Sequence, residues 1–276
     1  MKTKLKTFTR AQAAKSLLSL VPHISVENLV RASRFAEKLT RVERDRGTIR
    51  ALRELFERRH PAMMMAKDVM ERLSPNCRKK LIENLFVNAF LIGTDQREIE
   101  MPKREGFKPP MLLVISPTMR CNLRCPGCYA GEYEQHEGLS TELVDRIISE
   151  AKAMGTYFIT MSGGEIFVRP DMFDIWEQHS DVYFQLYTNG TMITEKVAAR
   201  LEECGNVAPM ISLEGFKERT DARRGEGTFD RVMAAMDNLR EAGVMFGVSF
   251  TETHENMGEI ASDRLLARLL REWVMG

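Results

Sequence analysis

Three closely spaced cysteines, Cys121, Cys125 and Cys128, constrain this chain more than any other feature. At this C-x3-C-x2-C spacing, three thiolates can bind three irons of a [4Fe–4S] cubane and leave the fourth iron open. Ordinary electron-transfer clusters use four cysteines, and no fourth cysteine follows within the motif. The spacing therefore predicts a cluster whose open iron can bind a substrate or a cofactor.

A structural zinc site is the first alternative, because zinc also binds thiolates. Such a site needs four protein ligands and no open position, commonly from two C-x2-C pairs, and only one such pair occurs here. His136 is near enough along the chain to be a fourth ligand, although the polar stretch 131–138 favours a solvated histidine. A disulfide framework suits small secreted domains, whereas this chain has 276 residues and an odd cysteine count of five. The other two, Cys77 and Cys204, are interpreted as packing residues.

The segments around the cysteines predict a βαβ unit. The apolar run 111–116 has no polar alternation, as expected for a parallel strand buried on both faces. A helix is expected to begin at Ser140, a good N-cap, and to end at Gly155, before a second strand-like run at 157–161. The cysteine loop and the Ser-Gly-Gly-Glu sequence at 162–165 then follow the carboxyl ends of two neighbouring strands, where α/β folds build their sites.

These two motifs, in this order and strand context, resemble those of the radical S-adenosylmethionine (radical SAM) superfamily. The resemblance covers about 105–276 and implies an enzyme in which the open iron chelates SAM. One electron from the cluster then cleaves the sulfonium to a 5′-deoxyadenosyl radical, which abstracts hydrogen from a substrate that the sequence does not identify. An external one-electron reductant of the flavodoxin or ferredoxin type is implied as well. The implied cluster ligands are Cys121, Cys125 and Cys128, and the implied SAM contacts are Tyr129, Ser162, Gly163, Gly164, Glu165, Thr188, Asn189, Ser212, Glu214 and Arg224.

The Ser-Gly-Gly-Glu motif suits the methionyl part of SAM. Gly163 and Gly164 lack Cβ atoms, so backbone can come close to the cofactor, and Glu165 supplies an acceptor for its ammonium group. A Gly-Gly pair alone would indicate only a turn, but the preceding strand and the glutamate favour the SAM site. Ile166 stands where many relatives have proline.

Two later signatures are carried over from the same resemblance. Thr188 and Asn189 belong to a Thr-Asn-Gly signature, and Ser212 and Glu214 match a Ser-x-Asp-Gly signature whose polar groups face ribose or methionyl atoms. Glu214 stands where aspartate is usual, so its contact is not fixed by the resemblance.

Two further residues complete the expected SAM site. Arg224, directly before Gly225, matches an arginine that often meets the SAM carboxylate; a solvated arginine in a Gly-rich loop is the alternative. Tyr129 follows the third cysteine and is expected to help wall the adenine. Because Pro126 and Gly127 fill the spacer where the family often has an aromatic residue, backbone could make the adenine contact instead.

The predicted fold class is α/β, a partial (β/α) barrel of the radical SAM type preceded by an all-helical domain. A last amphipathic helix is expected at 258–274. No sixth strand is found after it, so we expect either a truncated chain or completion of the sheet by another segment. The five expected strands are 111–116, 157–161, 184–191, 208–215 and 244–251.

The predicted domains are a basic helical domain at 1–105 and a radical SAM core at 106–276. Phe107-Lys-Pro-Pro110 is the expected linker, because paired prolines exclude helix. The helical domain is expected to contain helices from Ser25 through Leu55, from Pro61 onward, and from Ser74 to about Gly93.

The charge split between these two domains bears on partners. Residues 1–105 carry 23 Lys/Arg against 13 Asp/Glu, and residues 106–276 carry 17 against 26. Mutual attraction of the two domains explains this most simply; an anionic substrate or a lipid surface is the sharper alternative. Nucleic acid is disfavoured, because no set of stacking aromatics is interleaved with the basic residues.

Localisation and activity follow from the same features. No stretch is long enough to span a membrane and no signal peptide is found, so a cytoplasmic protein is expected, with a peripheral membrane position as the alternative. A non-catalytic iron–sulfur or zinc scaffold is the rival to an enzyme, and metal content separates the two.

Overall fold

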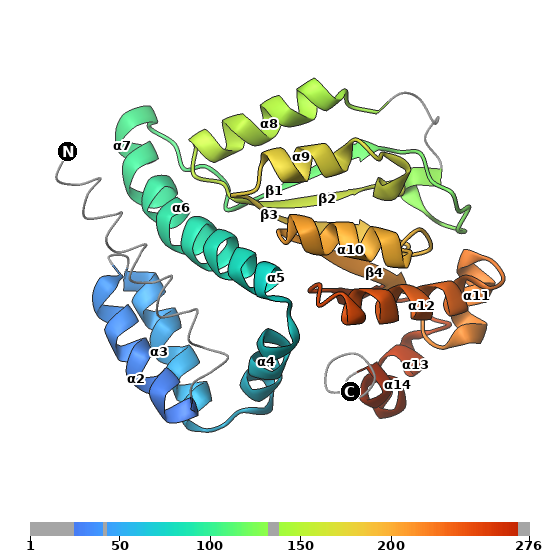
Figure 1. Cartoon of the computed structure of the whole chain (residues 1–276), viewed down its shortest axis with the longest axis horizontal. Coiled ribbons are helices and arrows are strands. Elements are labelled where there is room, and N and C mark those ends of the chain that lie inside the picture. The colour runs from blue at the N-terminus through green and yellow to red at the C-terminus, as the bar shows by residue number, and fades with distance from the viewer. Residues whose placement is uncertain (1–24, 41–42, 132–137, 270–276) are drawn as a thin grey trace.

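The computed structural model describes residues 25–40, 43–131 and 138–269, and it contains one parallel sheet flanked by helices (Figure 1). The strands lie in sequence order, so each neighbouring pair is joined by a helical crossover. This is a partial (β/α) barrel, which confirms the predicted fold class. The five strands are β1 (Leu112–Thr118), β2 (Phe158–Gly163), β3 (Tyr183–Thr188), β4 (Val207–Leu213) and β5 (Gly247–Phe250).

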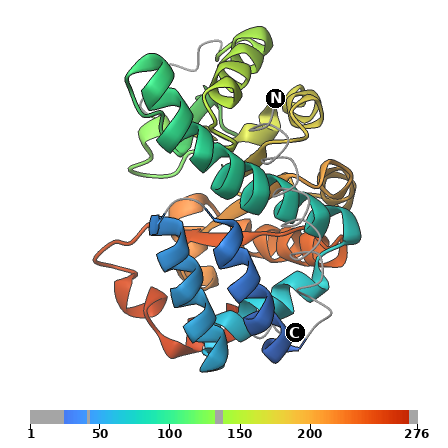
Figure 2. The same ribbon diagram turned by 90° about the vertical axis from the view of Figure 1, so that its left-hand side faces the viewer.

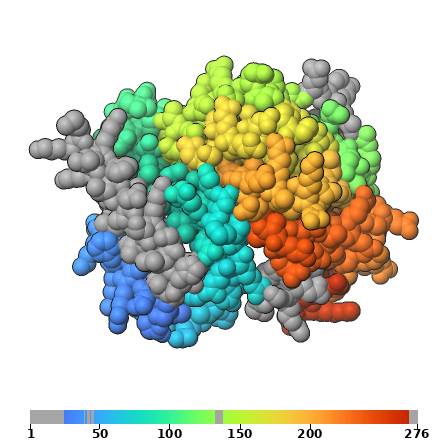
Figure 3. All heavy atoms as spheres, in the orientation of Figure 1, coloured from blue at the N-terminus to red at the C-terminus, as the bar shows by residue number. Residues whose placement is uncertain are grey.

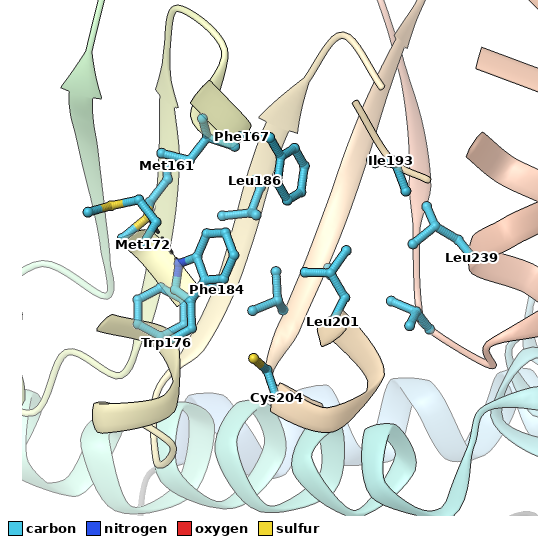
Figure 4. Packing of buried hydrophobic residues seen from close by; sticks show 14 of the residues in the cluster. Met161, Phe167, Met172, Trp176, Phe184, Leu186, Ile193, Leu201, Cys204 and Leu239 are labelled. Atoms are coloured by element: carbon cyan, nitrogen blue, oxygen red, sulfur yellow. Dashed lines mark hydrogen bonds between the residues drawn. The ribbon is translucent and has the colours of Figure 1, made fainter. Parts of the chain in front are cut away.

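One face of the sheet is buried under four helices. Side chains on this face, including Met161, Phe184 and Leu186, are fully buried against Trp176 and Leu201 of the helices (Figure 4). Complete burial of each such side chain stabilises the fold by roughly 1.5–3 kcal/mol. In the space-filling view these helices lie side by side and cover the sheet (Figure 3). They are α8 (Thr141–Ala153), α9 (Met172–Gln178), α10 (Glu195–Cys204) and α12 (Thr228–Glu241).

Several helices begin at the capping residues that the sequence predicts. The Ser140 hydroxyl accepts a hydrogen bond from Leu143 N at 3.2 Å, which confirms Ser140 as the N-cap of α8. The single helix predicted at 258–274 is instead two short helices, α13 (Met257–Ile260) and α14 (Asp263–Leu269), and its last residues lie outside the described chain. The short helix α11 (Lys217–Arg224) precedes α12.

The amino-terminal part of the described chain is helical. Ser25 caps α2 (Val26–Leu39) as predicted, its hydroxyl accepting from Asn28 N at 3.3 Å. The expectation of one helix through Leu55 was wrong, because Thr40 is extended (φ −86°, ψ 133°) and a second helix follows. That helix is α3 (Glu43–Glu57), and α4 (Pro61–Arg72) comes next.

A single long helical rod runs from Pro75 to Glu105, past its predicted end near Gly93. Gly93 lies inside the rod and does not end it. Its missing Cβ instead makes room for Gly155, since a Cβ at residue 93 would lie 2.4 Å from the Gly155 carbonyl oxygen. Ser74 caps the rod as predicted, accepting from Cys77 N at 3.1 Å. The rod consists of α5 (Pro75–Lys80), the π-helical η2 (Leu81–Ile92), α6 (Gly93–Asp95), the π-helical η3 (Gln96–Glu100) and α7 (Met101–Glu105).

This rod crosses the amino ends of the strands (Figures 1 and 2). Asn84 Nδ2 donates to the carbonyls of Ser180 and Val182 at 2.9 and 3.0 Å, just before β3. The buried Arg97 donates to the Gly155 carbonyl before β2. The rod therefore closes one end of the partial barrel, and the domain boundary near residue 105 stays a prediction. Among the described residues, no helix is both long and apolar enough to cross a membrane.

Candidate functional site

The sequence-predicted residues gather at the carboxyl ends of the strands, opposite the helical rod. Because all strands are parallel, the segments that follow β1, β2, β3 and β4 open onto the same edge of the sheet. The cysteine loop follows β1, the Ser-Gly-Gly-Glu turn ends β2, and the Thr-Asn turn ends β3. Glu214 follows β4 directly.

The cysteine loop is held against the Gly-Gly turn by backbone hydrogen bonds. Gly164 N donates to the Thr118 carbonyl and Glu165 N donates to the Arg120 carbonyl, each at 2.8 Å. A Cβ on Gly164 would lie 2.1 Å from the Arg120 oxygen. Gly163 has φ +112°, which favours glycine, and a Cβ there would lie 2.3 Å from the Thr118 oxygen. Both glycines are thus needed for the close approach of the cysteine loop.

The three predicted cluster ligands are free, half-buried thiols on this loop. Cys128 N donates to the Cys125 carbonyl at 3.2 Å, and Leu123 N donates to Cys121 Sγ at 3.4 Å. Burial raises the pKa of the Cys121 and Cys125 thiols above the ordinary value. For Cys125 the positive charge of Arg224 offsets part of this rise in pKa. Without metal, the Cys121 and Cys125 thiols are therefore protonated at neutral pH, and iron binding must release their protons.

The donor set suits an iron–sulfur cluster, because cysteine thiolates are the usual ligands of such clusters. Within the described ranges, no three His, Cys, Asp or Glu side chains converge closely enough to hold one metal ion. A cubane does not need such convergence, because each thiolate binds a different iron. Three thiols on one loop, one of which accepts a backbone N–H bond, match that requirement. His136 lies outside the described residues.

Glu165 is fully buried, with 0% of its surface exposed. Its Oε1 accepts from the Thr188 hydroxyl at 2.8 Å, and its Oε2 accepts from Asn189 N at 2.8 Å. Burial nevertheless raises the pKa of this carboxyl above its ordinary value. Glu165 thus ties the end of β2 to the Thr-Asn turn after β3, and its contact with the SAM ammonium stays a prediction.

Asn189 links the same turn to the cysteine loop. Its Nδ2 donates to Asn122 Oδ1 at 2.8 Å and lies 3.7 Å from Cys121 Sγ. Three segments, after β1, β2 and β3, are therefore connected by side-chain hydrogen bonds at one place. Asn122 was not singled out from the sequence, although its position next to Cys121 is a usable signal.

Glu214, directly after β4, forms a buried ion cluster with two arginines. Only 1% of its surface is exposed, and its Oε1 accepts from Arg224 Nε at 2.9 Å and Nη2 at 2.5 Å, and from Arg223 Nη1 at 2.5 Å. Asn256 Nδ2 donates to the Glu214 carbonyl at 3.2 Å. The structure thus brings the predicted Glu214 and Arg224 together and adds Arg223 and Asn256, which the sequence did not indicate.

The remaining predicted contacts lie at the same edge. The exposed Tyr129 places its hydroxyl 3.1 Å from Ser162 Oγ, and that hydroxyl accepts from Gly163 N at 2.9 Å. Ser212, half-buried on β4, lies beside Ser249 of β5. Tyr129 therefore contacts the Gly-Gly turn, and its role beside the adenine stays a prediction.

Comparison with known proteins agrees with this geometry. Residues 115–263 match the family model described as the Radical SAM superfamily. The chain is 33% identical over 179 residues to an Fe-coproporphyrin III synthase of Methanosarcina barkeri, covering 63% of this chain and 45% of that protein. It is 35% identical over 178 residues to the mycofactocin maturase MftC of Mycobacterium tuberculosis, covering 62% and 45%. Each match thus spans less than half of the relative.

Solved structures share the fold. A His-tagged anSMEcpe with bound AdoMet superposes with a TM-score of 0.53 at 21% identity, covering 60% of this chain and 48% of that one. SuiB of Streptococcus suis gives a TM-score of 0.53 at 18% identity, covering 74% and 52%. At these identities the likeness concerns the fold alone.

Proposed function

This chain belongs to the radical SAM superfamily, and we propose that it is a radical SAM enzyme. The cofactors of this family are a [4Fe–4S] cluster and SAM, as the sequence predicted. Cys121, Cys125 and Cys128 would hold the cluster, which supplies the electron for cleavage of SAM to a 5′-deoxyadenosyl radical. The observation that carries the proposal is the clamp of the cysteine loop onto the Gly-Gly turn, through Gly164 N to Thr118 O and Glu165 N to Arg120 O. These bonds hold the cysteine loop against the Gly-Gly turn, which supports a cluster on the three thiols next to SAM on that turn.

Two charged residues of this chain would bind the two charged groups of the methionyl part of SAM. Glu165 carries the negative charge that suits the SAM ammonium, and Arg224 carries the positive charge that suits its carboxylate. A guanidinium has five N–H donors, more than Glu214 uses, so Arg224 can bind a second carboxylate while it stays paired. Tyr129, anchored on the Gly-Gly turn, is suitably placed to contact the adenine or ribose.

Related proteins suggest two kinds of substrate. One relative is named an Fe-coproporphyrin III synthase, another is named a PqqA peptide cyclase, and one solved anSMEcpe structure contains the Cp18Cys peptide. A tetrapyrrole and a peptide are therefore both candidates for the molecule that loses hydrogen. An external one-electron reductant of the flavodoxin or ferredoxin type is part of the proposal.

Metal content and SAM turnover test the proposal. After anaerobic reconstitution, the wild-type chain should contain about four irons and form 5′-deoxyadenosine from SAM with dithionite as reductant. Replacing Cys121, Cys125 and Cys128 together by alanine should abolish both. Cys77→Ala and Cys204→Ala are the controls, because both thiols are buried in the core and should leave iron content unchanged.

Two results would count against an enzyme of this class. Wild-type protein that binds one zinc and no iron would favour the scaffold alternative. A triple cysteine variant that keeps a normal cluster spectrum would show that other residues bind the iron.

A further inference from the structure

The side chain of Asn189 uses its whole hydrogen-bonding capacity inside the site. A primary amide has two N–H donors and one oxygen that accepts two bonds. The oxygen of Asn189 accepts from the backbone N and the hydroxyl of Thr191, at 2.9 and 2.7 Å. Its Nδ2 donates to Asn122 Oδ1 at 2.8 Å and to Cys121 Sγ at 3.7 Å. These four bonds leave the amide no further donor or acceptor for SAM.

The orientation of this amide is fixed by its neighbours. A backbone N–H can only donate, so the Asn189 atom that faces Thr191 N must be the oxygen, and Nδ2 must face Cys121. Asn122 supports the same orientation, because its own Nδ2 donates to Thr191 Oγ1 at 2.9 Å and its Oδ1 then faces Asn189. Only 6% of Asn189 is exposed, so water competes little for these bonds.

The Cys121 sulfur depends on N–H donors to stabilise negative charge. It accepts from Leu123 N at 3.4 Å and from Asn189 Nδ2 at 3.7 Å. The buried Glu165 carboxyl, when ionised, acts against negative charge on this sulfur. Cys125 is different, since the guanidinium of Arg224 favours its thiolate. The two N–H groups therefore do for Cys121 what a positive charge does for Cys125.

Hydrogen bonds to sulfur affect how readily an iron–sulfur cluster accepts an electron. Reduction makes the cluster and its ligand sulfurs more negative. An N–H donor to such a sulfur thus stabilises the reduced form more than the oxidised form, and hydrogen bonds of this kind are among the factors that set the potential of a cluster. A donor aimed at a ligand sulfur therefore raises the reduction potential.

We propose that Asn189 is a positioning residue for the cluster, whose amide donates to the Cys121 sulfur and raises the reduction potential. Asn122 and the backbone N–H of Thr191 hold the amide in this orientation. The inference rests on the proposed function, because that function places a cluster on Cys121. It assigns the side chain of Asn189 to a cluster ligand, in place of the SAM contact expected from the sequence.

The midpoint potential of the cluster without SAM tests this assignment. Asn189→Leu keeps a side chain of similar shape and removes all four hydrogen bonds. The potential of the reconstituted full chain is measured by redox titration followed by electron paramagnetic resonance. We expect the equilibrium constant for reduction to fall at least about 3-fold in the variant, which is about 28 mV toward more negative potential at 59 mV per tenfold for one electron. A residue that acts only on SAM would leave the potential of the SAM-free cluster unchanged.

Thr191→Val is the matched control for local loosening. It removes the hydroxyl that bonds to Asn122 and Asn189 but keeps the backbone N–H that orients the amide. Its reduction equilibrium should stay within about 1.5-fold of the wild type, because neither lost bond involves sulfur. A shift as large as that of Asn189→Leu would show that loosening of the turn causes the effect, and would overturn the inference.

A spectroscopic test on the wild type covers the case in which Asn189→Leu does not fold. Protein labelled with 15N in its asparagine side-chain amides should show a 15N hyperfine coupling to the reduced cluster, since an N–H donor to a ligand sulfur carries some spin density. Asn122→Asp should keep this coupling, because it removes the other labelled amide of the network but retains the oxygen that accepts from Asn189. Loss of the coupling in Asn122→Asp, or its absence in the wild type, would contradict the proposed bond.

The outcomes separate this inference from the proposed function. Iron content and 5′-deoxyadenosine formation by the wild type decide the proposed function. A wild type that binds about four irons and cleaves SAM, but shows neither the 15N coupling nor a shift of potential in Asn189→Leu, would overturn this inference alone. A wild type that binds no iron would overturn both.

Discussion

Gly164→Ala should damage the cysteine loop although alanine fits the backbone of residue 164. Its added Cβ would lie 2.1 Å from the oxygen and 2.6 Å from the carbonyl carbon of Arg120. Backbone atoms cannot rotate away as a side chain can, so the loop must move by about 1 Å to reach normal contact. The hydrogen bonds from Gly164 N and Glu165 N, each 2.8 Å long, would then exceed normal length.

The magnitude follows from these two hydrogen bonds. At about 1 kcal/mol each, their loss lowers the free energy of unfolding by about 2 kcal/mol. For a protein of this size the melting temperature should then fall by about 4–8 °C. Because Cys121 directly follows Arg120, iron incorporation on reconstitution should fall as well.

Gly131→Ala is the matched control for this experiment. Gly131 belongs to the same loop, and among the described residues a Cβ there would meet only Cys128 Cβ at 3.9 Å, an ordinary contact. Differential scanning fluorimetry and iron analysis compare both variants with the wild type. If Gly164→Ala retains wild-type melting temperature and iron content, the close approach of the two loops does not hold the cysteines in place.

Two further predictions concern charged groups near the site. Glu214→Gln should lower the free energy of unfolding by about 3 kcal/mol, since it leaves Arg223 and Arg224 without their buried counter-charge; a denaturant midpoint equal to the wild type would contradict this. Arg169 holds the pKa of Asp171 at about 2, below its ordinary value of 3.8, so Asp171 stabilises the fold above that ordinary value and this contribution is lost as pH falls through about 2. The stability advantage of the wild type over Asp171→Asn should therefore shrink between about pH 4 and pH 2, and a constant difference across that range would refute the assignment.

The sequence predicted the strands and the motifs well, because both are local patterns. Parallel strands buried on a core are continuous apolar runs, and 157–161 lies almost wholly within β2, Phe158–Gly163. The order of the motifs along the chain then assigned the cysteine loop and the Gly-Gly turn to one edge of the sheet. That placement needed only the rule that parallel strands end together.

Features that depend on distant partners could not be predicted in this way. Gly93 has the sequence signature of a helix end, but its role comes from Gly155, which packs against it from another part of the chain. Asn256 reaches the Glu214 carbonyl from 42 residues away, and no local pattern indicates such a contact. The end of α2 at Thr40 has no Gly or Pro signal either, because Thr40 itself is the extended residue.

The helical rod across the strand ends has a consequence for synthesis on the ribosome. Asn84 of the rod and the Val182 carbonyl that it binds are 98 residues apart in sequence. At about 5–20 residues per second, the rod emerges roughly 5–20 s before its partner. During that interval Cys77, Leu81 and Ile82, which are buried in the finished fold, lack β3 as a packing partner. The apolar side of the rod should therefore stay partly uncovered on the nascent chain until β3 has been made.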